Sequence, residues 1–139
     1  MSITRRHEWP LRQAVLDHYA AKAMFARWAP GMLADYVAAG TETRDGLRVL
    51  AFDRAVETRI YDTLPHHLGT LLRRHPLRCP VGFIAGTRSR EVRQGGLGQA
   101  HALARERFAW IEGSHLYPME KPLETADAVL ALLATMPAA

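Results

Sequence analysis

The sequence is poor in cysteine and serine and contains no long apolar run. Cys79 has no partner for an internal disulfide, which excludes a disulfide-stapled scaffold and fits a reducing compartment. No hydrophobic stretch approaches the roughly 20 residues that span a bilayer. The first ten residues carry charge where a signal peptide would be apolar. We therefore expect a cytoplasmic protein without a membrane partner.

Lysine is also scarce, although the chain is basic. The net charge of +4 arises from 18 basic and 14 acidic residues, and only Lys22 and Lys121 are lysines. The arginines cluster no further than the pairs Arg5-Arg6 and Arg73-Arg74, which is typical of a solvated surface rather than a phosphate-binding patch. We therefore expect no nucleic-acid partner.

The composition that remains is that of a small globular protein. The chain has 139 residues, of which 48% are hydrophobic and 23% are charged. This length suits one domain, and the balance of apolar and charged residues excludes disordered and fibrous classes.

The first 75 residues are predicted to be mostly helical. Apolar residues at spacings of three and four, among them Leu11 and Tyr19, predict a helix from about residue 9 to 28. Gly40 is expected to cap a second helix from a left-handed conformation. The predicted elements are helices over 9–28, 32–39, 53–61 and 65–74, a polar turn over 41–46 and a strand or extended arm over 47–52. In the third helix, capped by Asp53, Val56 and Ile60 should face inward.

The pattern changes after Cys79. Continuous apolar runs at 81–85 and 108–111 predict strands buried on both faces. Helices are predicted over 97–105 and from Pro122, and strands that alternate with helices indicate a parallel sheet. In the last helix the predicted buried stripe consists of Ala126, Val129, Leu130 and Leu133. Two such strands make a narrow sheet, so we expect an exposed apolar edge that another strand or chain would cover.

In α/β folds the loops that leave the carboxyl ends of the strands hold the site, which directs attention to 86–96 and 112–121. The second loop reads Glu-Gly-Ser-His-Leu-Tyr-Pro-Met-Glu-Lys, followed by Pro122. This order resembles the histidine loop of the α/β-hydrolase superfamily, in which a strand is followed by Gly, a small residue, His and then a helix that begins with Pro. The resemblance implies that His115 is the catalytic histidine.

The preceding strand and loop, residues 79–91, resemble the superfamily's penultimate core strand and acid loop. Relatives often carry Ser-Asp where this chain has Ser89-Arg90, so the usual aspartate is missing. Glu91 is the nearest carboxylate that could orient His115. The alternative for Glu91 is a charge on a surface loop. Tyr117 and Met119, beside the histidine, either line a substrate pocket or fill the core.

The resemblance is specific over roughly 79–135 and implies a fold class for the whole chain. We expect an α/β protein with a partial parallel sheet, the C-terminal strands of an α/β-hydrolase core, preceded by a mostly helical lid-like segment. Residues 1–75 would be the lid and its return to the core, and residues 76–139 the C-terminal part of the core.

The superfamily's nucleophile is absent from these residues. It lies on a Gly-x-Ser-x-Gly elbow upstream of the acid and the histidine, and none of Ser2, Ser89 and Ser114 occupies such a pattern. Cys79 stands at the wrong end of its strand. We therefore expect a truncated or partial hydrolase whose nucleophile and oxyanion hole would lie upstream of Met1.

Other chemistry finds little support in the sequence. His66 and His67 are adjacent and so diverge on a helix, and no histidine or cysteine spacing matches a metal site. Gly95, Gly96 and Gly98 lack the pattern of a phosphate loop. We expect neither a metal nor another cofactor.

Two functions remain. The first is a partial serine-type hydrolase, inactive as this chain alone, with an ester or other acyl substrate once the missing half is supplied. The second is a non-catalytic α/β module that associates with itself or with a partner chain through its open sheet edge.

Overall fold

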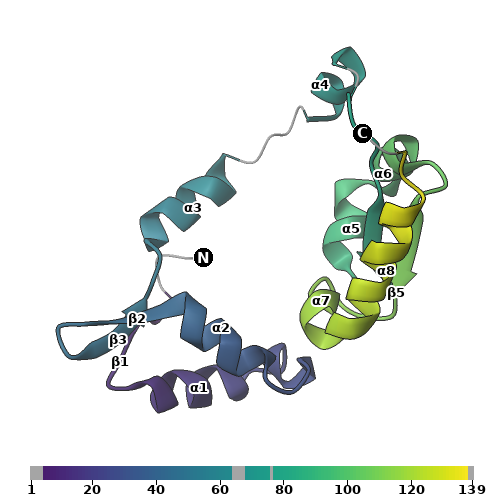
Figure 1. Ribbon diagram of the computed structural model, residues 1–139. Coiled ribbons are helices and arrows are strands. Elements are labelled where there is room, and N and C mark those ends of the chain that lie inside the picture. Colours follow the sequence, from purple (N-terminus) through teal and green to yellow (C-terminus); the bar gives the residue numbers. More distant parts are fainter. Residues whose placement is uncertain (1–4, 64–67, 76, 138–139) are drawn as a thin grey trace. The chain divides into compact units, whose positions relative to one another are not determined.

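The computed structural model describes residues 5–63, 68–75 and 77–137. The chain forms two compact units, Met1–His66 and His67–Ala139, each described by itself below (Figure 1). The fold is mixed α/β, with an antiparallel sheet in the first unit and a parallel pair of strands in the second. Within the described ranges no helix combines the length and apolarity needed to cross a membrane.

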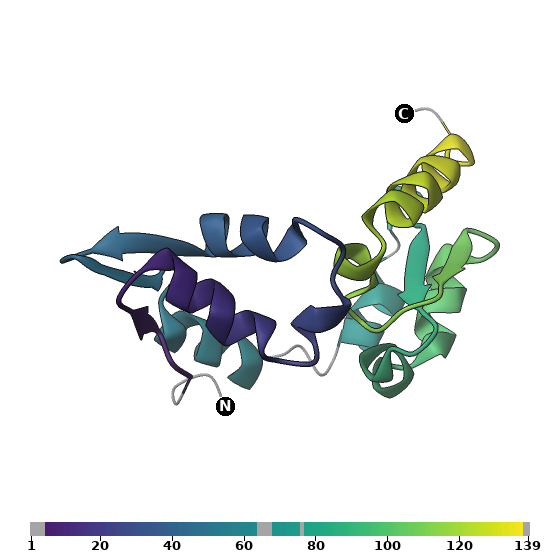
Figure 2. The same cartoon turned by 90° about the horizontal axis from the view of Figure 1, so that it is seen from below.

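The first unit contains a three-stranded sheet in the order β1 (Glu8–Trp9), β3 (Leu47–Leu50) and β2 (Thr41–Arg44). The strands are antiparallel, and β2 and β3 form a hairpin that extends away from the neighbouring helices (Figure 2). Asp45 and Gly46 have φ of 51° and 77°, the left-handed pair that a tight hairpin turn requires. The predicted polar turn over 41–46 is therefore wrong, since most of it is strand.

The helices of this unit are shorter than their apolar spacing predicts. The run from residue 9 divides into β1, α1 (Arg12–Ala20) and the 3₁₀ turn η1 (Phe25–Arg27). Trp9 pairs with β3, so it is unavailable to a helix, and Leu11 is exposed. The prediction of α2 (Met32–Gly40) is confirmed except for its end. Gly40 is helical rather than left-handed, and the chain passes directly into β2.

An aromatic core holds the sheet and these helices together. Tyr19 contacts Phe25 with ring centroids 4.9 Å apart, and Trp9 lies 6.0 Å from Tyr19. The core side chains are Trp9, Val15, Tyr19, Phe25, Val37 and Leu50, all buried. Their area removed from water is the main stabilising contribution to this unit.

Helix α3 (Arg54–Asp62) begins where the sequence predicts it. The Asp53 carboxylate accepts a hydrogen bond of 2.7 Å from the backbone N–H of Ala55, which satisfies an N–H that the helix itself leaves free. Val56 and Ile60 are exposed, however, so their predicted inward orientation is wrong.

The second unit contains the predicted parallel strands. Strand β4 (Phe83–Gly86) pairs with β5 (Phe108–Ile111), and Phe83 lies opposite Phe108. The helices are α4 (Leu68–Arg74), α5 (Arg90–Gly95), α6 (Leu97–Ala104), α7 (Tyr117–Glu120) and α8 (Pro122–Ala134). The predicted start of α4 near Pro65 lies outside the described residues. Helix α5 occupies part of the predicted polar loop.

Helix α8 packs on β5 with a different side from the one predicted. Val129, Leu130 and Leu133 are exposed, and so is Ala126. The half-buried positions are Thr125, Ala128 and Leu132, at helical spacings of three and four. Because α8 is apolar on most of its circumference, two stripes compete, and only the tertiary packing selects between them.

Candidate functional site

The loops after β4 and β5 meet at the carboxyl end of the parallel pair. The backbone N–H of Thr87 donates to the carbonyl of Ile111, and that of Arg88 donates to Gly113, both at 2.9 Å. The Arg88 guanidinium also contacts the Glu112 carboxylate at 2.8 Å. The two loops selected from the sequence are therefore bonded to each other at this end of the sheet.

Two glycines allow this close approach. A Cβ atom at Gly86 would overlap the carbonyl oxygen of Ser114, and a Cβ at Gly113 would lie 2.8 Å from the Cβ of Tyr117. Both contacts would be closer than packed carbon and oxygen atoms tolerate, so these two positions require glycine.

Ser114 and Glu120 hold the histidine loop in shape. The Ser114 hydroxyl donates to one carboxylate oxygen of Glu120 at 2.6 Å, and the Ser114 backbone N–H donates to the other at 3.0 Å. The same hydroxyl accepts a hydrogen bond from the backbone of Leu116. The backbone on either side of His115 is therefore fixed by polar bonds rather than by a large apolar core.

His115 is held by Ser89 and lies near Glu91. The Ser89 Oγ lies 3.1 Å from His115 Nδ1 and 3.1 Å from Glu91 Oε2. The direct distance between Nδ1 and Oε2 is 3.9 Å, longer than a hydrogen bond. Ser89 also caps α5 by accepting from the backbone N–H of Val92 at 3.2 Å. The hydroxyl thus stands between the carboxylate and the imidazole.

The bonds around Ser89 assign the tautomer of the neutral imidazole. A hydroxyl has one proton to donate and two lone pairs to accept with. The ionised Glu91 can only accept, so it takes the proton, and the Val92 N–H takes one lone pair. The second lone pair then accepts from Nδ1–H of His115. This leaves Nε2 unprotonated, with no described residue bonded to it, and more than half of the His115 side chain is exposed.

The Glu91 carboxylate is kept ionised by its surroundings. The backbone N–H of Glu91 itself, at the start of α5, lowers the pKa of its carboxyl, and the Ser89 hydroxyl and His115 add to the effect. Because the carboxylate remains an acceptor to lower pH than an ordinary glutamate, the direction of the hydrogen bond from Ser89 is maintained.

A hollow of about 330 Å³ lies beside this cluster. Glu91 and His115 belong to its lining, together with residues of α4, β4, α5 and α6. Most of the surface that lines it is apolar. The site therefore combines a basic imidazole nitrogen with an adjoining space for an apolar group.

The predicted site residues fall into two groups. Glu91, at the start of α5, and His115, in the loop after β5, are 24 residues apart in the sequence and lie near one another, with Ser89 bonded to both. Tyr117 and Met119 are half-buried and lie outside the described lining of the hollow, and the Tyr117 hydroxyl donates to the carbonyl of Ile84 at 3.2 Å. Their role in a substrate pocket stays a prediction.

Ser89 is the residue that the sequence analysis missed. It is 1% exposed and its hydroxyl has a partner for each of its bonds, so it is a positioning residue rather than a nucleophile. The available signal was its place as a serine directly before a helix in the segment that follows β4, where a short hydroxyl side chain caps the helix and can reach the facing loop.

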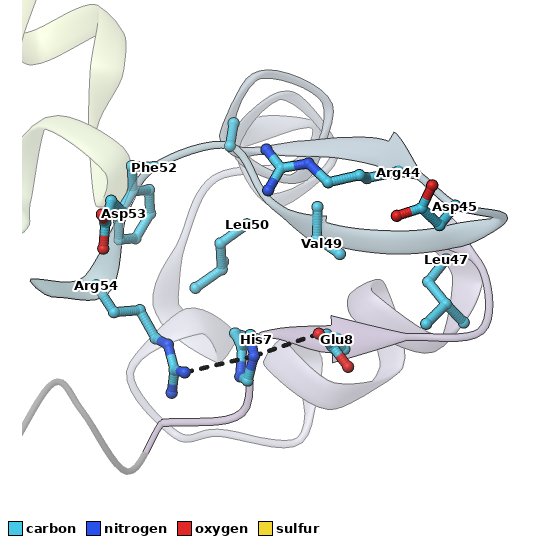
Figure 3. Close-up of a pocket in the computed structure, with 11 residues that line it drawn as sticks. His7, Glu8, Arg44, Asp45, Leu47, Val49, Leu50, Phe52, Asp53 and Arg54 are labelled. Carbon is cyan, nitrogen blue, oxygen red and sulfur yellow. Dashed lines mark hydrogen bonds and ion pairs between the residues drawn. The ribbon is translucent and has the colours of Figure 1, made fainter.

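A second hollow, of about 540 Å³, lies in the first unit between β1, the β2–β3 hairpin and the start of α3 (Figure 3). His7 stands between Arg54 and Glu8, with Nε2 at 3.4 Å from each partner atom. The described lining includes both acidic and basic side chains. It therefore presents no single sign of charge that would select a ligand, and no group of three metal-ligating side chains occurs anywhere in the described ranges.

Comparisons with known proteins leave the assignment to the geometry. No family model matches the chain, and neither a curated protein nor a solved structure matches it significantly. The resemblance to α/β-hydrolases therefore stays a prediction from the residues of the two loops.

Proposed function

We propose that the second unit supplies the histidine part of an acyl-hydrolase site, with His115 as the general base. The observation that supports this is the hydrogen bond that His115 Nδ1–H donates to the Ser89 hydroxyl, because it leaves the lone pair of Nε2 available to take a proton. Glu91 acts through Ser89 and stabilises the imidazolium that forms. The substrate class is a small ester or related acyl compound.

The nucleophile of the proposed site comes from residues outside the 139. In the reaction, Nε2 removes the proton of an attacking hydroxyl while the oxygen of that hydroxyl bonds to the acyl carbon. The bond to the leaving oxygen then breaks, and the imidazolium returns the proton to it. Without a positioned nucleophile and oxyanion donors, this chain alone turns over poorly, since those parts supply much of the rate.

Acyl transfer to an added alcohol tests the role of His115. The chain would be mixed with 4-nitrophenyl octanoate and 2,2,2-trifluoroethanol, whose hydroxyl replaces the missing nucleophile. We expect transfer to the alcohol at least ten-fold faster than with His115→Ala, a modest part of the range that positioned general bases reach. His75→Ala, at an exposed histidine after α4, is the matched control and should retain the wild-type rate.

Each half of the proposal can fail in this assay. Equal rates for wild type and His115→Ala would refute the role of His115. Rapid hydrolysis without the alcohol, lost in His115→Ala, would contradict the expectation that this chain alone turns over poorly. Ser89→Ala should shift the His115 tautomer toward Nε2–H in ¹⁵N-detected spectra, which loss of a helix cap alone would not do.

A second function rests on a different observation. Helix α8 exposes Leu123, Leu130 and Leu133, with Leu123 80% exposed. Apolar side chains gathered on one helix are typical of an interaction surface. A non-catalytic module that associates through this helix and the sheet edge predicts a dimer in sedimentation, converted to a monomer by Leu130→Glu. A monomeric wild type would exclude self-association.

A further inference from the structure

The hollow beside His115 is built from apolar side chains of several elements of the second unit. Strand β4 contributes Phe83 to its lining, and α6 contributes Leu97 and Leu103. Among the residues that the structure describes, the apolar side chains of the lining are Leu72, Val81, Phe83, Val92, Leu97, Ala100 and Leu103. Because these residues come from separate helices and a strand, the fold rather than one local segment determines the hollow.

Polar side chains in the lining are few. Glu91 and His115 belong to one hydrogen-bonded cluster, and Gln99 is the remaining polar side chain of the described lining. Ligand sites in proteins commonly have this character, a predominantly apolar wall with a few polar groups that orient the ligand. The arrangement selects an apolar group that carries a polar atom at one end.

The size of the hollow limits its occupant. A volume of about 330 Å³ is at the lower end of ligand sites. At about 30 Å³ for each water-sized group, it holds about ten non-hydrogen atoms. This is the size of a medium-length acyl chain or a single aromatic ring with substituents.

The charge at the cluster limits the polar end. Glu91 accepts from Ser89 and is ionised, so a free carboxylate placed beside it would meet a like charge. An ester carbonyl carries no charge and can approach His115 without this repulsion. The free acid that ester cleavage releases would therefore leave the hollow readily.

We propose that this hollow binds the apolar acyl part of a neutral ester, about eight to ten non-hydrogen atoms long, with the ester group beside His115. The ester headgroup rests on the proposed function, whereas the apolar site itself does not. Ala100, half-buried on α6 and part of the lining, is the position at which a larger side chain would fill the space without touching the polar cluster.

Titration of the full chain with methyl octanoate, followed by amide chemical shifts, tests the proposal. We expect saturable shifts at Val92, Leu97 and Leu103, and at least ten-fold weaker binding by Ala100→Phe. Ala126→Phe, at an exposed alanine of α8 outside the lining, should bind as the wild type does. Octanoate at pH 8 should bind at least five-fold more weakly than the ester, and Glu91→Gln should narrow this difference.

The binding readout is separate from the acyl-transfer assay. The wild type should bind methyl octanoate saturably even if no acyl transfer is detected, because binding needs neither a nucleophile nor a proton transfer. Failure of the general-base role and failure of the apolar site are therefore distinguishable. Unchanged binding by Ala100→Phe would overturn the proposal. Tighter binding of octanoate or octylamine than of the ester would also overturn it. So would an Ala100→Phe protein whose association state changes while its ester binding does not.

Discussion

The two units of the chain differ in how completely each buries its own apolar side chains. The first unit has an aromatic core in which Trp9, Val15 and Val37 are at most 1% exposed. In the second unit the buried apolar side chains are small or few, such as Ala85 and Ala104, and Leu123, Leu130 and Leu133 of α8 are exposed. The unit with the weaker core nevertheless holds the organised polar cluster.

This difference shows that a site can be ordered without a large core beneath it. In the second unit the loops are fixed by backbone bonds across the sheet end, by glycines that permit close approach, and by the Ser114–Glu120 pair. Each such bond contributes only about 1 kcal/mol, but together they restrict the loop that carries His115. We expect the units to respond differently to matched substitutions.

The largest expected difference is between two tryptophans. Trp9→Ala removes a 1% exposed side chain from the first unit and should lower its free energy of unfolding by about 3–5 kcal/mol. Trp110 is 48% exposed on β5, so Trp110→Ala should cost the second unit about 1 kcal/mol. Amide hydrogen exchange within α1 and β5 measures the two effects separately. Equal losses would remove the contrast between the cores.

An intermediate effect is expected from two glycines of the second unit. Gly86→Ala places a Cβ against the Ser114 carbonyl and should cost about 1–3 kcal/mol while displacing His115 from Ser89. Gly98→Ala is the control, because no atom lies near its added Cβ, and it should stabilise α6 by about 0.5–1 kcal/mol. Urea unfolding and the His115 tautomer are the two measurements. A Gly86→Ala protein with an unchanged tautomer would contradict the role of this contact.

The smallest expected effect is a loss of folding stability at alkaline pH, and it is compared for one tyrosine of each unit. Burial raises the pKa of Tyr19 and that of Tyr117 above the ordinary value of 10.0. Between that value and the raised one, the unfolded chain has released a proton that the folded chain keeps, so stability falls as pH rises. At lower pH both states hold the proton and the effect vanishes.

Phenylalanine substitutions assign this alkaline loss to a unit. Tyr19→Phe should reduce it in the first unit, and Tyr117→Phe in the second, as measured by urea midpoints at pH 9 and pH 11. If Tyr117→Phe leaves the difference between the urea midpoints of the second unit at pH 9 and pH 11 unchanged, the burial of Tyr117 does not control the loss of stability at alkaline pH.

Much of the second unit was predictable because its signals are local. Continuous apolar runs identified β4 and β5, and Pro122 identified the start of α8. The histidine loop was predicted from its order of residues. In the first unit the hairpin was missed, although Asp45-Gly46 is a strong turn signal, because the polar residues of β2 were interpreted as a loop.

The sequence by itself determined the parallel strands, the two loops at their carboxyl ends and the presence of His115 and Glu91 in them. The tertiary structure decided that Ser89 joins these two side chains, which side of α8 packs on the sheet, and where the apolar hollow lies. The physical reason is that strands and caps depend on neighbours along the chain. A hydroxyl shared by two loops, or a choice between two apolar stripes, depends instead on contacts between residues distant in sequence.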